Sequence, residues 1–105
     1  MPAATKKRAT SRKTVTVRTP NKPGHSAEVN AEKYEAMRKI LKRVMPRKSP
    51  GYTQPEMMTA VGKVAPKDLF PKHTYHWWAK CVELDLEVRG ELAREKTTPI
   101  RWHLT

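Results

Sequence analysis

A run of basic side chains begins at Arg38, in a segment with helical periodicity, and continues into the loop that follows. Guanidinium and ammonium groups along one helix face are suited to phosphate oxygens, because each contact neutralises a charge and releases a counterion. The set consists of Arg38, Lys39, Lys42, Arg43, Arg47 and Lys48. We expect it to contact a polyanion. The competing interpretation is a solvated helix face that only confers solubility.

The first thirteen residues add a second group of cations and offer almost nothing to bury. We expect residues 1–13 to be disordered, because folding them would bury no apolar surface to offset the lost chain entropy. Basic arms of this kind bind phosphates without fixed structure or enter the minor groove. The alternative is a terminus with no selected role. The cations are Lys6, Lys7, Arg8, Arg12 and Lys13.

The distribution of charge supports a functional N-terminal half. The net charge is +12 over 105 residues. Residues 1–48 hold fourteen Lys or Arg and three acids, whereas residues 49–105 hold eight Lys or Arg and seven acids. The net charges are therefore +11 and +1, and attraction to DNA, RNA or another acidic partner is expected from the first half.

A third helix, expected from about residue 74 to residue 89, shows a different pattern. Trp77, Cys81, Leu84 and Val88 form one apolar line, which Trp78, Val82 and Leu86 widen to about half of the circumference, so we expect this helix to be largely buried. The exposed remainder would then be Ala79, Lys80, Glu83 and Glu87. An acidic face repels phosphate, so we do not expect this helix to read a major groove in the usual helix-turn-helix manner.

Other groups that could carry chemistry have simpler interpretations. His73, His76 and Cys81 lack the paired spacing of a structural zinc site, and a cysteine on an apolar line is usually a small apolar filler. Asp85 lies inside the apolar arc, where Arg89 four residues later is its natural partner. No phosphate loop or nucleophile motif is present. We therefore expect no metal, no cofactor and no enzymatic activity.

The elements that position these groups follow from periodicity and turn residues. A hairpin is expected over residues 14–29, and Asn30 caps a helix that Pro46 ends. Thr53 and Glu56 read as a capping box for a short second helix. After the third helix, Gly90 leads into a second hairpin with strands near 91–95 and 100–104.

This order predicts an α+β fold: a winged-helix-like three-helix domain over residues 14–105, with an N-terminal hairpin and a C-terminal hairpin as the wing. The wing's cations Arg94, Lys96 and Arg101 are partly offset by Glu91 and Glu95. The expected core residues come from all three helices, the second connector and the last strand. They are Tyr34, Met37, Leu41, Met57, Val61, Phe70, Trp77, Cys81, Leu84 and Trp102.

Several segments together resemble a family of small uncharacterised bacterial proteins that are predicted to be winged-helix-like. They are Ala31–Arg38, Thr53–Met57, Asp68–Pro71, Trp77–Lys80, Leu84–Glu87 and Pro99–His103. The resemblance covers about residues 15–103 and implies the fold. It implies no activity and no functional residues, and the basic tail extends beyond the family pattern.

Two functions follow as hypotheses. The first is a nucleic-acid-binding module that relies on phosphate contacts from its N-terminal half, with DNA favoured over RNA. The second is a protein–protein interaction module, in which the basic half confers solubility or meets an acidic partner. A single cysteine and the lack of a secretory or membrane-spanning segment favour a cytoplasmic protein without membrane contact.

Overall fold

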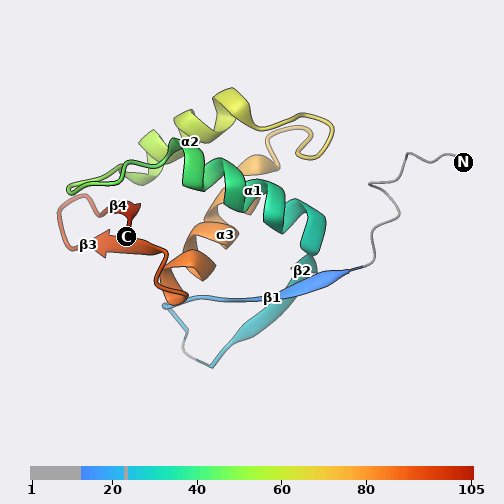
Figure 1. Ribbon diagram of the computed structural model, residues 1–105, viewed down its shortest axis with the longest axis horizontal. Coiled ribbons are helices and arrows are strands. Elements are labelled where there is room, and N and C mark those ends of the chain that lie inside the picture. Colours follow the sequence, from blue (N-terminus) through green and yellow to red (C-terminus); the bar gives the residue numbers. More distant parts are fainter. Residues whose placement is uncertain (1–12, 23) are drawn as a thin grey trace, which may run out of the picture.

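The fold combines three helices with two antiparallel hairpins, which confirms the expected α+β class (Figure 1). The structure is a computed structural model and describes residues 13–22 and 24–105. Its elements are β1 (Thr14–Arg18), β2 (Ser26–Asn30), α1 (Ala31–Val44), α2 (Gln54–Val64), α3 (Tyr75–Val88), β3 (Leu92–Glu95) and β4 (Arg101–Leu104). Each lies within a few residues of its expected position.

Side-chain caps fix where the first two helices begin, as the sequence predicts. The Asn30 side chain accepts a hydrogen bond of 2.9 Å from the backbone N–H of Lys33 at the start of α1. At α2, the N–H of Thr53 donates to Glu56 over 2.8 Å and the N–H of Glu56 donates back to Thr53 Oγ1 over 3.4 Å. These bonds satisfy backbone donors that the first helical turn leaves free.

The two hairpins lie at different ends of the helical layer (Figure 1). In the first, Val17 of β1 lies opposite Ala27 of β2, and in the second Leu92 of β3 lies opposite Leu104 of β4. Tyr52, just before α2, forms an isolated β-bridge to Trp102. Each backbone nitrogen donates to the carbonyl oxygen of the other residue, with a nitrogen-to-oxygen distance of 2.8 Å in both bonds. This bridge ties the α1–α2 loop to the outer edge of β4.

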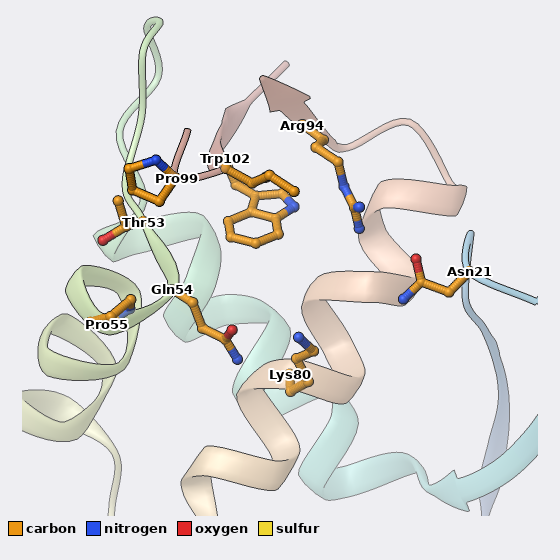
Figure 2. Close-up of a pocket in the computed structure, with 9 residues that line it drawn as sticks. Asn21, Thr53, Gln54, Pro55, Lys80, Arg94, Pro99 and Trp102 are labelled. Atoms are coloured by element: carbon orange, nitrogen blue, oxygen red, sulfur yellow. The ribbon is translucent and has the colours of Figure 1, made fainter. Parts of the chain in front are cut away.

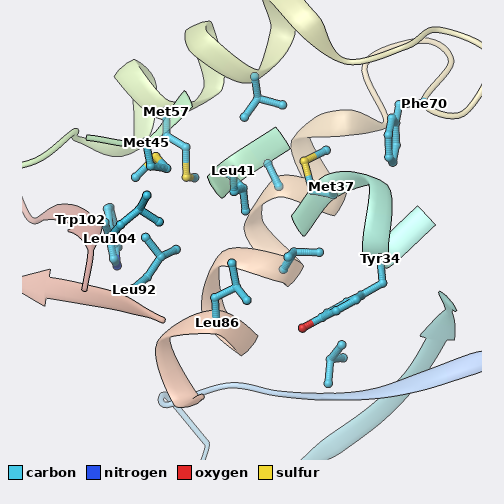
Figure 3. Packing of buried hydrophobic residues seen from close by; sticks show 14 of the residues in the cluster. Tyr34, Met37, Leu41, Met45, Met57, Phe70, Leu86, Leu92, Trp102 and Leu104 are labelled. Atoms are coloured by element: carbon cyan, nitrogen blue, oxygen red, sulfur yellow. The ribbon is translucent and has the colours of Figure 1, made fainter. Parts of the chain in front are cut away.

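The core lies between α1, α2, α3 and the second hairpin (Figure 3). Tyr34, Met37 and Leu41 of α1 pack with Ala79, Val82 and Leu86 of α3. The second hairpin closes one end of this core with the buried side chains of Leu92, Trp102 and Leu104. Of the expected core residues, those from α1, α2, the second connector and β4 are confirmed.

The face that α3 buries differs from the expected one. Trp77 is 58% exposed and Val88 is 44% exposed, while Cys81 and Leu84 are half-buried, so the predicted buried line was wrong. Ala79 and Glu83, expected on the exposed face, are fully buried. Val82 and Leu86, on one side of the expected apolar arc, are fully buried as predicted. Together with Ala79 they form the core side of the helix, which is therefore rotated about its axis relative to the expected apolar line.

A buried carboxylate helps to hold α3 in this orientation. Asp85 is only 1% exposed, and it accepts hydrogen bonds from the Tyr34 hydroxyl of α1 and the N–H of Arg18 of β1, the latter over 2.9 Å. Arg89 Nε lies 2.6 Å from its second oxygen, as the sequence predicts. Burial and the bond to Asp85 raise the pKa of Tyr34 well above its usual value. Asp85 therefore joins α3 to both α1 and β1.

Glu83 is the second carboxylate that the rotation buries. Its relative exposure is 0%, and neither of its oxygens has a hydrogen-bond partner among the described residues. Burial, with the neighbouring Glu87 carboxylate as a further cause, raises the pKa of Glu83 to about 8. At neutral pH the side chain therefore holds its proton, which reduces the cost of burying it.

We expect the variant Asp85→Asn to lose about 1.5–3 kcal/mol of unfolding free energy, because it removes charge-assisted hydrogen bonds from a buried site. Urea denaturation followed by circular dichroism measures this loss. The exposed Glu35 on α1 provides a matched control. Glu35→Gln should change stability by less than about 0.5 kcal/mol. An Asp85→Asn variant as stable as the parent would contradict the role assigned to this carboxylate.

Glu83→Gln should flatten the dependence of stability on pH. Between the ordinary glutamate pKa and about 8, the folded chain keeps a proton on Glu83 that the unfolded chain releases. The parent protein therefore loses stability as pH rises through this window, and the variant lacks this contribution. Melting temperatures of both proteins from about pH 5 to about pH 8 measure the difference. Parallel profiles would show that Glu83 is ionised in the folded protein.

Candidate nucleic-acid interface

The basic residues of α1 divide into two groups in the structure. Arg38 and Lys42 lie one helical turn apart, and both reach Glu91, which lies between α3 and β3, over 2.9 Å and 3.2 Å. Burial alone would raise the pKa of Glu91, but the bond to Lys42 and the charges of Arg38 and Lys42 lower it below its usual value. These two cations are therefore partly neutralised, and they hold α1 against the start of the second hairpin.

The other four cations of this run are exposed. In the part of the chain that the structure describes, no carboxylate pairs with Lys39, Arg43, Arg47 or Lys48. Lys39 and Arg43 are one turn apart on α1, and Arg47 and Lys48 continue beyond its end. We call these four residues the unpaired basic surface.

The loop that carries Arg47 and Lys48 is fixed by bonds to β4. The N–H of Leu104 donates to the carbonyl oxygen of Pro46 over 2.8 Å, and Arg101 Nη1 donates to that of Gly51 over 3.0 Å. Gly51 has a φ of 90°, and a Cβ there would lie 2.1 Å from the carbonyl oxygen of Trp102. Only glycine fits this close approach. The loop thus presents its cations from an anchored backbone.

A local structural role also accounts for part of this charge. Arg43 lies in the last turn of α1, where a cation interacts favourably with the negative end of the helix dipole. Glu35, one turn before Lys39 in α1, supplies a nearby opposite charge. Neither explanation applies to Arg47 and Lys48, which follow the helix and are exposed.

Several acids and bases of the C-terminal half form ion pairs with one another. Arg101 pairs with Glu56 over 3.2 Å, and Arg94 Nε lies 2.8 Å from Glu87. His103 Nε2 lies 2.8 Å from Glu95, and its bonds to Leu104 and Glu95 raise the pKa of the imidazole. These acids are thereby used within the fold, while Lys63, Lys67, Lys72 and Lys96 of the same half are exposed and form no ion pair with the described residues.

The acidic face expected on α3 does not exist. Glu83 is buried, and Glu87 accepts a hydrogen bond of 3.1 Å from Trp102 Nε1 in addition to its pairing with Arg94. The expected repulsion between α3 and phosphate therefore has no basis. The outward face instead carries exposed apolar side chains, Trp77 and Val88, together with His76.

Four of the five tail cations, Lys6, Lys7, Arg8 and Arg12, lie outside the described residues. Lys13 is described and exposed. Its carbonyl oxygen accepts a hydrogen bond of 2.9 Å from the N–H of Ala31, where α1 begins. The basic N-terminal segment is therefore attached close to the first turn of α1.

The fold does not bring the other candidate residues, the histidines and Cys81, together into a metal site. Within residues 13–22 and 24–105, no group of three or more His, Cys, Asp or Glu side chains could hold a metal ion. Burial, and then the nearby Asp85, raise the pKa of the Cys81 thiol to about 11. Among the same residues, no helix is long and apolar enough to cross a membrane.

A pocket that the sequence does not reveal lies between the start of α2, α3 and the second hairpin (Figure 2). Its volume is about 430 Å³. Lys80 and Gln54 extend toward its centre, and Trp102 lies above them in this view. The lining residues come from distant parts of the chain, from Asn21 to Trp102, so no local spacing in the sequence marks the site.

Comparison with known proteins assigns the chain to a family without assigning an activity. No curated protein and no solved structure matches it significantly. A family of unknown function, DUF6958, matches residues 14–102, from the first residue of β1 to Trp102 in β4. This span includes every helix and most of both hairpins. The chain belongs to this family of unknown function (DUF6958).

Proposed function

We propose that the protein binds nucleic acid, chiefly through phosphate contacts made by the unpaired basic surface and the basic N-terminal segment. One observation carries the proposal: four exposed cations from Lys39 to Lys48 have no carboxylate partner among the described residues. Arg89, Arg94 and Arg101 are held in ion pairs. Other exposed lysines, such as Lys63 and Lys67, also lack an ion pair among the described residues, so what distinguishes the four is their clustering within residues 39–48. Unpaired surface cations are the groups that gain most from replacing counterions on a nucleic-acid backbone.

The chemistry of this surface favours binding without sequence preference. Lysine and arginine on an exposed helix contact phosphates, whereas base reading also needs side chains that enter a groove. The outward face of α3 supports base reading poorly, because Trp77 and Val88 are apolar. Duplex DNA is the favoured partner, since we propose that α1, α2, α3 and the β3–β4 hairpin form a winged helix in which the hairpin is the wing.

A second candidate function follows from the same outward face of α3. Trp77 and Val88 are large apolar side chains exposed at 58% and 44%. Large exposed apolar side chains are a feature of protein-binding surfaces, and the half-buried Cys81 and Leu84 lie between these two on the helix. The protein would then be an interaction module with an acidic protein partner, and the unpaired basic surface would contribute attraction and solubility.

Charge reversal at Lys39 and Arg43 should weaken binding to every DNA sequence alike. Each phosphate contact contributes about −0.9 to the slope of log affinity against log salt, so Lys39→Glu with Arg43→Glu should reduce the slope by about 1.8. Fluorescence anisotropy with two unrelated duplexes at several salt concentrations measures both effects. Lys63→Glu with Lys72→Glu is the matched control, because it changes the net charge equally and Lys63 also lies in a last helical turn, that of α2.

Deletion of residues 1–12 should lower both affinity and salt slope, because it removes four cations and leaves Lys13 bonded to Ala31. The same anisotropy titrations measure this, and circular dichroism checks that the domain stays folded. If the parent protein binds no duplex DNA, single-stranded DNA or RNA at low salt, the nucleic-acid function is ruled out. The protein–protein interaction module is then the remaining candidate function. Binding unaffected by either the double reversal or the deletion would place the interface elsewhere on the chain.

A further inference from the structure

We propose that the pocket between α2, α3 and the β3–β4 hairpin binds an organic anion, a carboxylate or phosphate group carried on a flat apolar body. The proposal does not depend on nucleic-acid binding. The pocket volume of about 430 Å³ lies within the range of roughly 300–1,000 Å³ that is usual for small-molecule sites. Its lining is divided into a polar side and an apolar side (Figure 2).

The polar side offers donors and a free positive charge. Lys80 has no ion pair among the described residues, and in Figure 2 its side chain extends into the opening beside Gln54. Arg94 donates a hydrogen bond from Nη2 to Glu87, and its Nε lies 2.8 Å from the same carboxylate without forming a hydrogen bond, so this guanidinium is already partly neutralised. The amides of Gln54 and Asn21 add two further polar groups that line the pocket. A carboxylate or phosphate needs donors and positive charge of this kind.

Among the described residues, no carboxylate forms an ion pair with Lys80. Neither Glu83 nor Glu87 lines the pocket, although both follow Lys80 on α3. Glu87 is committed to Arg94 and to Trp102 Nε1. Glu83 is fully buried, and its pKa, raised to about 8 chiefly by burial, keeps it neutral at pH 7. The lining therefore contains two cations and no carboxylate, which favours an anionic ligand over a cationic one.

The apolar side is built from rings and a branched side chain. Pro55, Pro99, Ile100 and Trp102 line it, and Ile100 is 39% exposed. In Figure 2, Pro55 and Pro99 lie on the side of the pocket opposite Arg94 and Asn21. A ligand with an anionic end and a flat apolar end can satisfy both sides at once. An inorganic anion would leave the apolar side unfilled.

The pocket is separate from the unpaired basic surface. Its residues belong to α3, the β3–β4 hairpin, the β1–β2 turn and the start of α2, and none belongs to α1. Lys39 and Arg43 are on α1, which runs behind the pocket in Figure 2. Variants at the two sites therefore test the two proposals independently.

The test uses the full chain and nuclear magnetic resonance titrations with benzoate and phenyl phosphate as probes. We expect saturable shifts of the Trp102 indole N–H and of the backbone amides of Lys80 and Gln54 with at least one probe. The probe that binds more tightly identifies the preferred anionic group. Benzyl alcohol and inorganic phosphate each lack one half of the ligand, and both should bind at least about tenfold more weakly. Equal binding of benzyl alcohol would overturn the requirement for an anion.

Variants at Lys80 separate its charge from its packing. Lys80→Met should weaken binding by about tenfold or more, since it keeps the apolar stem and removes the charge. Lys80→Arg should retain binding, which also controls for folding of α3. Lys39→Met, the same change on α1, should leave the titration unchanged. Absence of saturable shifts with both probes at millimolar concentrations, or equal binding by the parent and Lys80→Met, would refute the proposal.

Discussion

The buried carboxylate of Asp85 is the interaction on which the arrangement of this fold depends. It accepts hydrogen bonds from Tyr34 in α1 and from the backbone of Arg18 in β1, and it pairs with Arg89 on its own helix. A buried charge is tolerated only when its oxygens are satisfied. Arg89 also donates to the carbonyl oxygen of Thr16 over 3.2 Å, so the first hairpin is held at two points on α3.

The rotation of α3 has consequences on both of its sides. Asp85 is directed toward α1 and β1. In this orientation Val82 and Leu86 pack in the core, and Glu83 is buried. Trp77 and Val88, at the two ends of the expected apolar line, are left exposed, whereas Cys81 and Leu84 between them are half-buried. In this orientation α3 therefore presents two apolar side chains to solvent and lacks the acidic face expected from the sequence.

Much of the fold could be predicted from local signals in the sequence. The helix ends depend on neighbouring residues only. Side-chain caps from Asn30 and from Thr53 with Glu56 mark where α1 and α2 begin, and the backbone conformation of Gly90 marks where α3 ends. The rotation of α3 could not be predicted, because periodicity ranks lines of residues by hydrophobicity: it placed Asp85 inside the apolar arc but assigned Glu83, which is buried, to solvent. Asp85 is satisfied by Tyr34 and Arg18, which are 51 and 67 residues away. No pattern within the helix indicates these partners.

The two candidate sites were predictable to different degrees, because one is built from neighbouring residues and the other from distant ones. The run from Arg38 to Lys48 is local, so the sequence predicts it, but the pairing of Arg38 and Lys42 with Glu91 appears only in the fold. That pairing reduces the expected surface to Lys39, Arg43, Arg47 and Lys48. The pocket at Lys80 and Trp102 is assembled from separate segments and required the structure. Membership of a family of unknown function adds no assignment to either site.

The orientation of α3 can be tested directly by the solvent exposure of its tryptophans. Chain labelled with 5-fluorotryptophan gives one fluorine resonance for each of Trp77, Trp78 and Trp102, assigned by single substitutions to phenylalanine. The shift of each resonance between H2O and D2O reports contact with solvent. The account predicts the largest shift for Trp77, which is 58% exposed, and almost none for Trp102, which is 5% exposed. A solvent-protected Trp77 would show that α3 buries its apolar line and that Asp85 does not set its rotation.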